Sequence, residues 1–249
     1  MDDLNYYLIL IFLLSIIQSI FGLGLLILGT PILLFFDVIF IKILYIILPS
    51  SITVSLFNLI FISKLEKKYL SIKFLENFFL FCLPYVICGL TLVYFFESKI
   101  NFQLLTGSII IMTLLLKIVL TKKNYFYYAN NNRKIINSLI GIIHGLTNVG
   151  GSFLALFLST INKNNQLKTR IQITFIYFIF ATTQYLYITF VFKKQFNIPT
   201  INIIMISLFA CVIGKILLKK INNNFFLKIL YFLIFTSAIS LILRSIKVL

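Results

Sequence analysis

The chain has 249 residues, of which 61% are hydrophobic and only 11% charged, and its mean hydropathy is +1.07. A soluble domain is about 45–50% apolar and roughly 25% charged, so this composition excludes a soluble globular protein. Lys and Arg exceed Asp and Glu by 16. In a soluble protein such an excess would suggest nucleic-acid binding, but the apolar runs are too long for a nucleic-acid-binding surface. We attribute the excess to lysines that flank membrane segments on the cytoplasmic side.

Eight apolar stretches are predicted as membrane segments, because a bilayer core about 30 Å thick requires around 20 apolar residues per helix. In chain order they are Leu4–Phe36, Lys42–Ser63, Phe74–Phe96, Phe102–Leu120, Ile135–Ile161, Ile171–Phe192, Ile201–Leu218 and Phe226–Leu243. The first and the fifth are longer than one crossing needs, and glycine and small polar residues interrupt both in the middle. We expect each of these two to form a broken helical hairpin.

The two interrupted stretches resemble each other at a constant offset of 126 residues, about half the chain. Ser15–Leu26 aligns with Gly141–Ser152, and three ordinary spans follow each copy. We therefore predict an all-α polytopic membrane protein with a twofold internal repeat, each copy a glycine-broken hairpin plus three transmembrane helices. The predicted first repeat is 1–120, the cytoplasmic linker is 121–134 and the second repeat is 135–249, and together they form one membrane domain.

The distribution of Lys and Arg favours one of two topologies. If every apolar stretch crosses once, the 22 basic residues divide into 13 inside and 9 outside. If the two broken stretches enter and return on the same side, 16 lie inside and 6 outside. The second topology follows the positive-inside rule better, inverts the second repeat relative to the first and places the acidic N-terminus outside.

The two breaks are the strongest functional signal, because inverted repeats with broken helices are a recurring plan of secondary transporters. A helix that starts at each break can attract an anion through its free N–H groups, and glycine lets a ligand approach the backbone. We predict that the binding site for a small anion contains Ser19, Gly22, Gly24, Thr30, His144, Thr147, Asn148, Gly150, Gly151 and Ser152. The alternative is that these small residues allow close helix packing, which is the interpretation we give to Ser15/Ser19 and Gly141/Gly145.

His144 is the only histidine of the chain, and it lies in the second break. Its imidazole can carry a proton or donate a hydrogen bond to an anion. The matching residue of the first copy, Gln18, is uncharged. A hydrogen-bonded histidine with a structural role is therefore an equal alternative. The same offset relates Asn58 to Gln184, for which interhelical hydrogen bonds are a sufficient explanation.

Acidic residues are confined to the first 97 positions and avoid the centres of the apolar runs. Paired-carboxylate hydrolysis, two-metal chemistry and an intramembrane carboxylate relay therefore lack the residues they need. Cys82, Cys88 and Cys211 lack a metal-binding spacing and are interpreted as buried packing residues. We expect no cofactor, no metal and no nucleic-acid partner; the oligomeric state stays open, and a homo-oligomer is compatible with the sequence.

At the breaks the sequence resembles the TauE/SafE family of sulfite-exporter-like permeases. Members carry a glycine-rich turn near the start of each half, followed in the first half by a proline. The residues that match are Gly22-Leu-Gly24 with Pro31, and Asn148-Val-Gly150-Gly151-Ser152, preceded by Gly141 and Gly145. Leu25, Leu26, Asn148 and Ser152 stand where glycines are usual, and Phe157 stands at the proline position. The resemblance implies transport of a small sulfur-containing anion, such as sulfite, thiosulfate or an organosulfonate, across a bacterial inner membrane.

Three function classes follow. The first is a permease that works by alternating access between the two repeats and is not an enzyme. The second is a membrane scaffold or assembly factor without a substrate, in which the glycine turns only pack. The third is an intramembrane hydrolase with a Ser152–His144 dyad, which lacks a third group to orient the histidine.

Overall fold

The computed structural model describes most of the chain. Described are residues 2–119, 131–162, 165–194, 196, 198–218, 232, 235–236 and 238–246, with the side chains of 2–4 and 117–119 left out. Every regular element within these ranges is a helix, as predicted.

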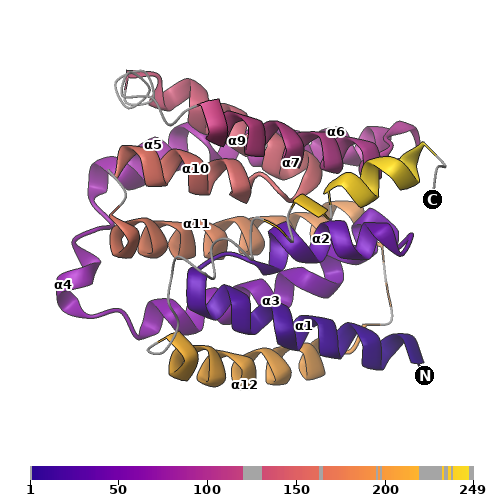
Figure 1. Cartoon of the computed structure of the whole chain (residues 1–249), viewed down its shortest axis with the longest axis horizontal. Coiled ribbons are helices and arrows are strands. Elements are labelled where there is room, and N and C mark those ends of the chain that lie inside the picture. Colours follow the sequence, from indigo (N-terminus) through magenta and orange to yellow (C-terminus); the bar gives the residue numbers. More distant parts are fainter. Residues whose placement is uncertain are drawn as a thin grey trace.

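The helices follow the apolar stretches closely (Figure 1). The first half contains α1 (Asp2–Phe21), α2 (Leu25–Phe35), α3 (Phe40–Ile60), α4 (Lys64–Lys67), α5 (Ile72–Phe81), α6 (Leu83–Phe96), the 3-10 turn η1 (Glu97–Lys99) and α7 (Phe102–Val119). The second half contains α9 (Arg133–Thr147), α10 (Gly151–Ile161), α11 (Gln166–Tyr187), the π-helical turn η2 (Ile188–Phe192) and α12 (Thr200–Leu218).

Four helical segments in the described ranges are long and apolar enough to cross a membrane. They are Phe40–Ile60, Ile72–Lys99, Gln166–Phe192 and Thr200–Leu218, and they match four of the predicted single spans. A fifth predicted span coincides with α7. The sixth, Phe226–Leu243, lies largely outside the described residues.

Both predicted interruptions are present, and each contains backbone in the left-handed region. In the first break Gly22 has φ +76° and Gly24 has φ +151°, values that residues with a Cβ rarely adopt. In the second break the left-handed residue is Asn148, with φ +62°, at the C-terminus of α9. Because asparagine tolerates this conformation better than most residues, Asn148 makes the turn without a glycine.

Each break reverses the chain, so both interrupted stretches are hairpins. At the open end of the first hairpin the rings of Tyr6 and Phe36 lie 5.3 Å apart. Nearer its turn, a Cβ on Gly29 would lie 3.2 Å from Leu14 Cδ1. In Figure 1 α1 runs leftward from the N-terminus and α2 returns to the right, whereas α10 returns to the left end, from which α9 starts. The two hairpins therefore enter the molecule from opposite ends.

Side-chain contacts join the two halves of the chain. Between α4 and α11, Gln172 Nε2 donates to the Tyr69 carbonyl oxygen at 2.9 Å. Asp37, which follows α2, pairs with Arg244, and Glu97 of η1 pairs with Lys194. Both ion pairs join an acid of the first half to a base of the second half.

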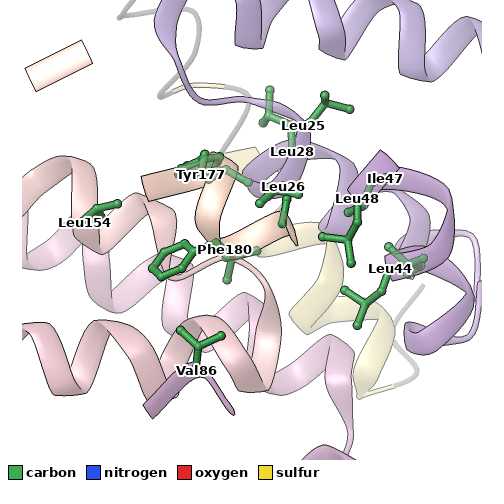
Figure 2. Close-up of a cluster of buried hydrophobic side chains, with 14 of the residues drawn as sticks. Leu25, Leu26, Leu28, Leu44, Ile47, Leu48, Val86, Leu154, Tyr177 and Phe180 are labelled. Carbon is green, nitrogen blue, oxygen red and sulfur yellow. The ribbon is translucent and has the colours of Figure 1, made fainter. Parts of the chain in front are cut away.

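The core surrounds α2, α3 and α11 (Figure 2). Among its fully buried side chains are Leu25, Leu26, Leu28, Leu44, Ile47, Leu48, Val86, Leu154, Tyr177 and Phe180. Because lipid tails are as apolar as leucine, dense packing and small residues hold membrane helices together more than the hydrophobic effect does.

Small residues bring α6 and α9 into backbone contact. A Cβ on Gly145 would lie 2.2 Å from the Val86 carbonyl oxygen, and one on Gly141 would lie 2.3 Å from the Cys82 carbonyl oxygen. The packing interpretation of Gly141/Gly145 is therefore confirmed.

Ser15 and Ser19 also pack against other helices. Ser15 Oγ lies 2.9 Å from Ser50 Oγ, and Ser19 Oγ donates to the Cys211 carbonyl oxygen at 3.2 Å, which confirms the same interpretation for this pair.

The cysteine prediction holds for two of three residues. Cys82 and Cys211 are buried, whereas Cys88 is exposed. Cys88 lies on α6, whose exposed apolar residues include Tyr85 and Leu92. The prediction for Cys88 is therefore wrong, because apolar neighbours in the sequence occur both in the core and on an exposed face of a membrane helix.

Candidate functional site

At the first break both the oxygen and the nitrogen of the Gln18 side-chain amide have hydrogen-bond partners. Gln18 Oε1 accepts the backbone N–H of Leu25, the first residue of α2, at 3.3 Å. Gln18 Nε2 donates to Ser51 Oγ at 3.0 Å and to Ser55 Oγ at 3.1 Å. A side chain of α1 thus caps α2, and this amide also ties both helices to α3.

The other predicted residues of the first break serve as packing surfaces. The carbonyl oxygen of Ser19 accepts from Asn58 Nδ2 at 3.2 Å and from Arg170 Nη2 at 3.1 Å. A Cβ on Gly22 would lie 2.6 Å from Thr174 Oγ1, and one on Gly24 would lie 2.6 Å from Ile17 Cγ2. The contacts of Ser19, Gly22 and Gly24 are therefore with other helices.

The second break contains buried polar atoms without hydrogen-bond partners. His144 has no exposed surface, neither ring nitrogen has a partner, and its ring stacks on Phe180 with centroids 4.0 Å apart. Tyr177 is also fully buried, and its hydroxyl has no partner. Buried polar groups are normally paired, so groups left unpaired in a cluster are candidates for ligand contact.

The hydroxyl of Tyr177 lies against the first residue of α10. A Cβ on Gly151 would lie only 1.7 Å from Tyr177 Oη, so glycine is the one residue that fits there. The N-cap residues of α2 and α10, Gly24 and Gly150, are both glycines and have no side chain to cap their helices. The N-terminus of α10 thus faces a phenol hydroxyl from α11, whereas the N-terminus of α2 is capped by Gln18.

Asn148 connects the second break to the first half. Its Nδ2 donates to Thr30 Oγ1 of α2 at 3.0 Å, and both side chains are fully buried. Its Oδ1 has no partner. Thr147 Oγ1 donates to the Ile143 carbonyl oxygen of its own helix at 2.7 Å. The structure therefore brings together Thr30, Thr147, Asn148 and His144 at the second break.

Ser152 is not paired with His144. Its Oγ donates to the Val149 carbonyl oxygen at 2.9 Å and lies 3.4 Å from Thr113 Oγ1 of α7. A catalytic dyad needs the hydroxyl to bond to the imidazole, and the described geometry contains no such bond. The two residues also lie on different helices, α9 and α10.

The interhelical role expected for the polar pair Asn58 and Gln184 is also found. Gln184 Nε2 lies 3.5 Å from the His144 carbonyl oxygen, and Asn58 bonds to Ser19 as described. The side-chain oxygen of each residue has no partner, so this matched pair leaves one unpaired atom at each break.

Tyr177 and Arg170 are the site residues that sequence reasoning missed. Tyr177 is one of 13 tyrosines and Arg170 is one of 22 basic residues, so composition singles out neither. Tyr177 and Phe180 both contact the His144 ring, and this shared face of α11 becomes visible only in the assembled fold.

A surface pocket of about 500 Å³ lies away from the breaks, between the α2–α3 connection and η1. Asp37 and Glu97 line it, together with Lys99 and Gln103. Both carboxylates are paired with bases of the second half, Asp37 with Arg244 and Glu97 with Lys194. Within the described residues no group of three His, Cys, Asp or Glu side chains could hold a metal ion.

A family model described as "Sulfite exporter TauE/SafE" matches residues 7–241, nearly the whole chain. The chain belongs to the TauE/SafE family. It is therefore a multi-pass membrane protein of a transporter family. No curated protein and no solved structure matches the chain.

The stretch Asn148-Val-Gly150-Gly151-Ser152 lies within the matched residues and connects α9 to α10. Asn148 takes the left-handed position at the start of that connection, and Ser152 continues α10 with its hydroxyl bonded back to Val149. Chemically, the second break offers neutral donors and acceptors, which suits weak, reversible binding of a small anion. The charged residue Arg170 lies at the first break, where it donates to the Ser19 carbonyl oxygen.

Proposed function

We propose that this protein is a permease of the bacterial inner membrane that moves a small sulfur-containing anion, such as sulfite, thiosulfate or an organosulfonate, by alternating access. The family match supports the substrate class. The observation that carries the mechanism is the pair of broken hairpins, which enter from opposite ends and meet through the Asn148–Thr30 hydrogen bond.

Helix boundaries support an inverted repeat. The helix α2 begins at Leu25 and α10 at Gly151, 126 residues apart, and their last residues, Phe35 and Ile161, have the same separation. The helices α3 and α11 begin 126 residues apart as well. Moreover, α1 packs on α12 while α9 packs on α6, so each hairpin packs on the matching helix of the other half.

The site would bind its anion through neutral groups. A helix N-terminus carries a partial positive charge, and hydrogen bonds from hydroxyl and amide donors add to it. A site without a fixed countercharge holds an anion less strongly, which permits release on the far side.

The membrane potential can drive export. Moving one elementary charge across 100 mV changes the free energy by about 2.3 kcal/mol, and a negative interior expels an anion. No acidic residue lies in the middle of an apolar stretch, so coupling to protons would run through His144 or through the substrate itself.

The orientation follows the positive charges. We infer that the end carrying α4 and the starts of α9 and α11 is cytoplasmic, because 16 of the 22 Lys and Arg residues belong to that end of the hairpin topology. The end with the Asp37–Arg244 and Glu97–Lys194 pairs would then face outward.

Flux into proteoliposomes tests the proposal. We expect saturable uptake of radiolabelled sulfite, thiosulfate or methanesulfonate under an imposed potential. Asn148→Asp should abolish this flux, because it keeps the side-chain shape and adds a negative charge at the break.

The matched control is Asn137→Asp at the other end of the same helix, and it should leave the flux intact. Folded protein that moves none of the three anions under either polarity would contradict the proposal and favour a scaffold without a substrate.

A further inference from the structure

The two breaks have related sequences, but their polar groups are satisfied very differently. At the first break, Gln18 bonds with α2 and with two serines of α3. At the second break, 126 residues later, the equivalent position is His144, whose two ring nitrogens have no partner.

The same contrast appears on the helix that packs against each break. Ser51 of α3 accepts a hydrogen bond from Gln18 at 3.0 Å. The residue 126 positions later is Tyr177 of α11, whose buried hydroxyl has no partner and lies at the N-terminus of α10. In the matched pairs Gln18/His144 and Ser51/Tyr177, the residue of the first half belongs to a hydrogen-bond network. The residue of the second half has side-chain hydrogen-bonding groups without a partner.

From this asymmetry, and resting on the proposed function, we infer that the anion binds at one break only. The site is the N-terminus of α10, with the Tyr177 hydroxyl and the His144 imidazole as donors to an anionic oxygen. The first break, closed by Gln18, is the structural counterpart that does not bind the ligand.

Burial supports this assignment. Both His144 and Tyr177 are fully buried, so neither donor is exposed to bulk solvent. A buried donor left unpaired is costly, and an anion that accepts its hydrogen bond recovers this cost. The helix N-terminus adds a favourable partial charge at the same place.

The chemistry also limits the ligand. A neutral imidazole has one N–H donor and a phenol has one O–H donor, so the side chains supply two directed hydrogen bonds without a formal charge. A compact oxyanion can accept both at once, whereas a halide lacks separate acceptor oxygens. We therefore expect sulfur oxyanions to bind in preference to chloride.

Equilibrium binding to the full chain in nanodiscs tests the inference, with radiolabelled sulfite and thiosulfate as probes and chloride as competitor. Tyr177→Phe keeps the packed ring and removes only the hydroxyl, and His144→Gln installs the residue of the first break. Each should weaken binding about tenfold or more, the usual value of a hydrogen bond to a charged group. Ser51→Ala removes the matched hydroxyl of the first half and should change the affinity less than about twofold.

The two proposals fail in different ways. If wild-type protein transports the anions but Tyr177→Phe and His144→Gln bind them like wild type, the one-break site is wrong and the permease stands. A loss of affinity in Ser51→Ala as large as in Tyr177→Phe also overturns the asymmetry. If wild type neither binds nor transports any of the anions, both proposals fail.

Discussion

Asn148 Nδ2 donates a hydrogen bond to Thr30 Oγ1 across 118 residues of sequence, at 3.0 Å and without solvent exposure of either side chain. The donor lies at the end of α9, and the acceptor lies in the middle of α2. This bond joins the two broken hairpins within the protein core. A movement of one half relative to the other would lengthen or break this hydrogen bond, so the bond couples the positions of the two halves.

Removing the acceptor should weaken this connection. Thr30→Val keeps the shape of the side chain and leaves the Asn148 amide without its partner. We expect a loss of about 0.5–2 kcal/mol in the free energy of unfolding, the range for interhelical hydrogen bonds in membranes. The measurement is thermal or detergent-induced unfolding of the purified protein.

Thr182→Val is the control, because the Thr182 hydroxyl bonds only within its own helix, to the Phe178 carbonyl oxygen. Equal stability of Thr30→Val and Thr182→Val would show that the bond between the hairpins contributes nothing.

A second prediction concerns the contact between Gly151 and Tyr177. Gly151→Ala places a Cβ 1.7 Å from the Tyr177 hydroxyl oxygen, and we expect overpacking of about 1–3 kcal/mol. Adding Tyr177→Ala removes the obstacle, so the double variant should show a favourable coupling of about 1 kcal/mol or more in a double-mutant cycle.

Gly150→Ala provides the contrast. Its Cβ would meet the backbone nitrogen of His144 at 2.6 Å, which no side-chain change relieves, so Tyr177→Ala should not rescue it. Rescue of both glycine variants, or of neither, would contradict the close contact described here.

A third prediction concerns pH. Hydrogen bonds from Arg244, assisted by Gln103, hold the pKa of Asp37 below its ordinary value. A lowered pKa in the folded state stabilises the protein above the pKa of the unfolded chain, and this contribution is lost as the pH falls through the folded value. Asp37→Asn should therefore be less stable than wild type at pH 7, by at most about 1 kcal/mol because the pair is exposed.

The difference between the two proteins should shrink as the pH falls through the lowered pKa of Asp37 in the folded state. Unfolding curves at pH 7 and at a series of lower pH values measure it. A difference that persists unchanged into acid would mean that the carboxylate charge is not its source.

Sequence patterns were sufficient for the helices and for the breaks. Glycine and small polar residues inside an apolar run predicted the turns at Gly22–Gly24 and Asn148–Gly150, because glycine and asparagine tolerate left-handed backbone. The length of each apolar stretch predicted the spans, because the bilayer thickness sets the helix length.

The contacts of individual side chains could not be predicted in the same way. Nothing in the sequence distinguishes Tyr177 from the lipid-facing tyrosines, since its environment depends on how α11 packs against α9. The pairing of Asp37 with Arg244 spans 207 residues and depends on the assembled fold. The sequence also could not predict that the two breaks differ in hydrogen bonding. Gln18 and His144 are both polar and occupy matching positions, and they differ in whether the fold supplies hydrogen-bond partners.

Alternating opening of the two ends is tested most directly at the outer end. In a variant whose native cysteines are replaced, Asp37→Cys and Arg244→Cys place a thiol on each half where the two residues pair, and a short reducible cross-linker can join them. We expect anion flux into proteoliposomes to stop when the two halves are joined and to return after reduction, while each single-cysteine variant keeps its flux throughout. Undiminished flux through fully cross-linked protein would contradict transport by opening of this end.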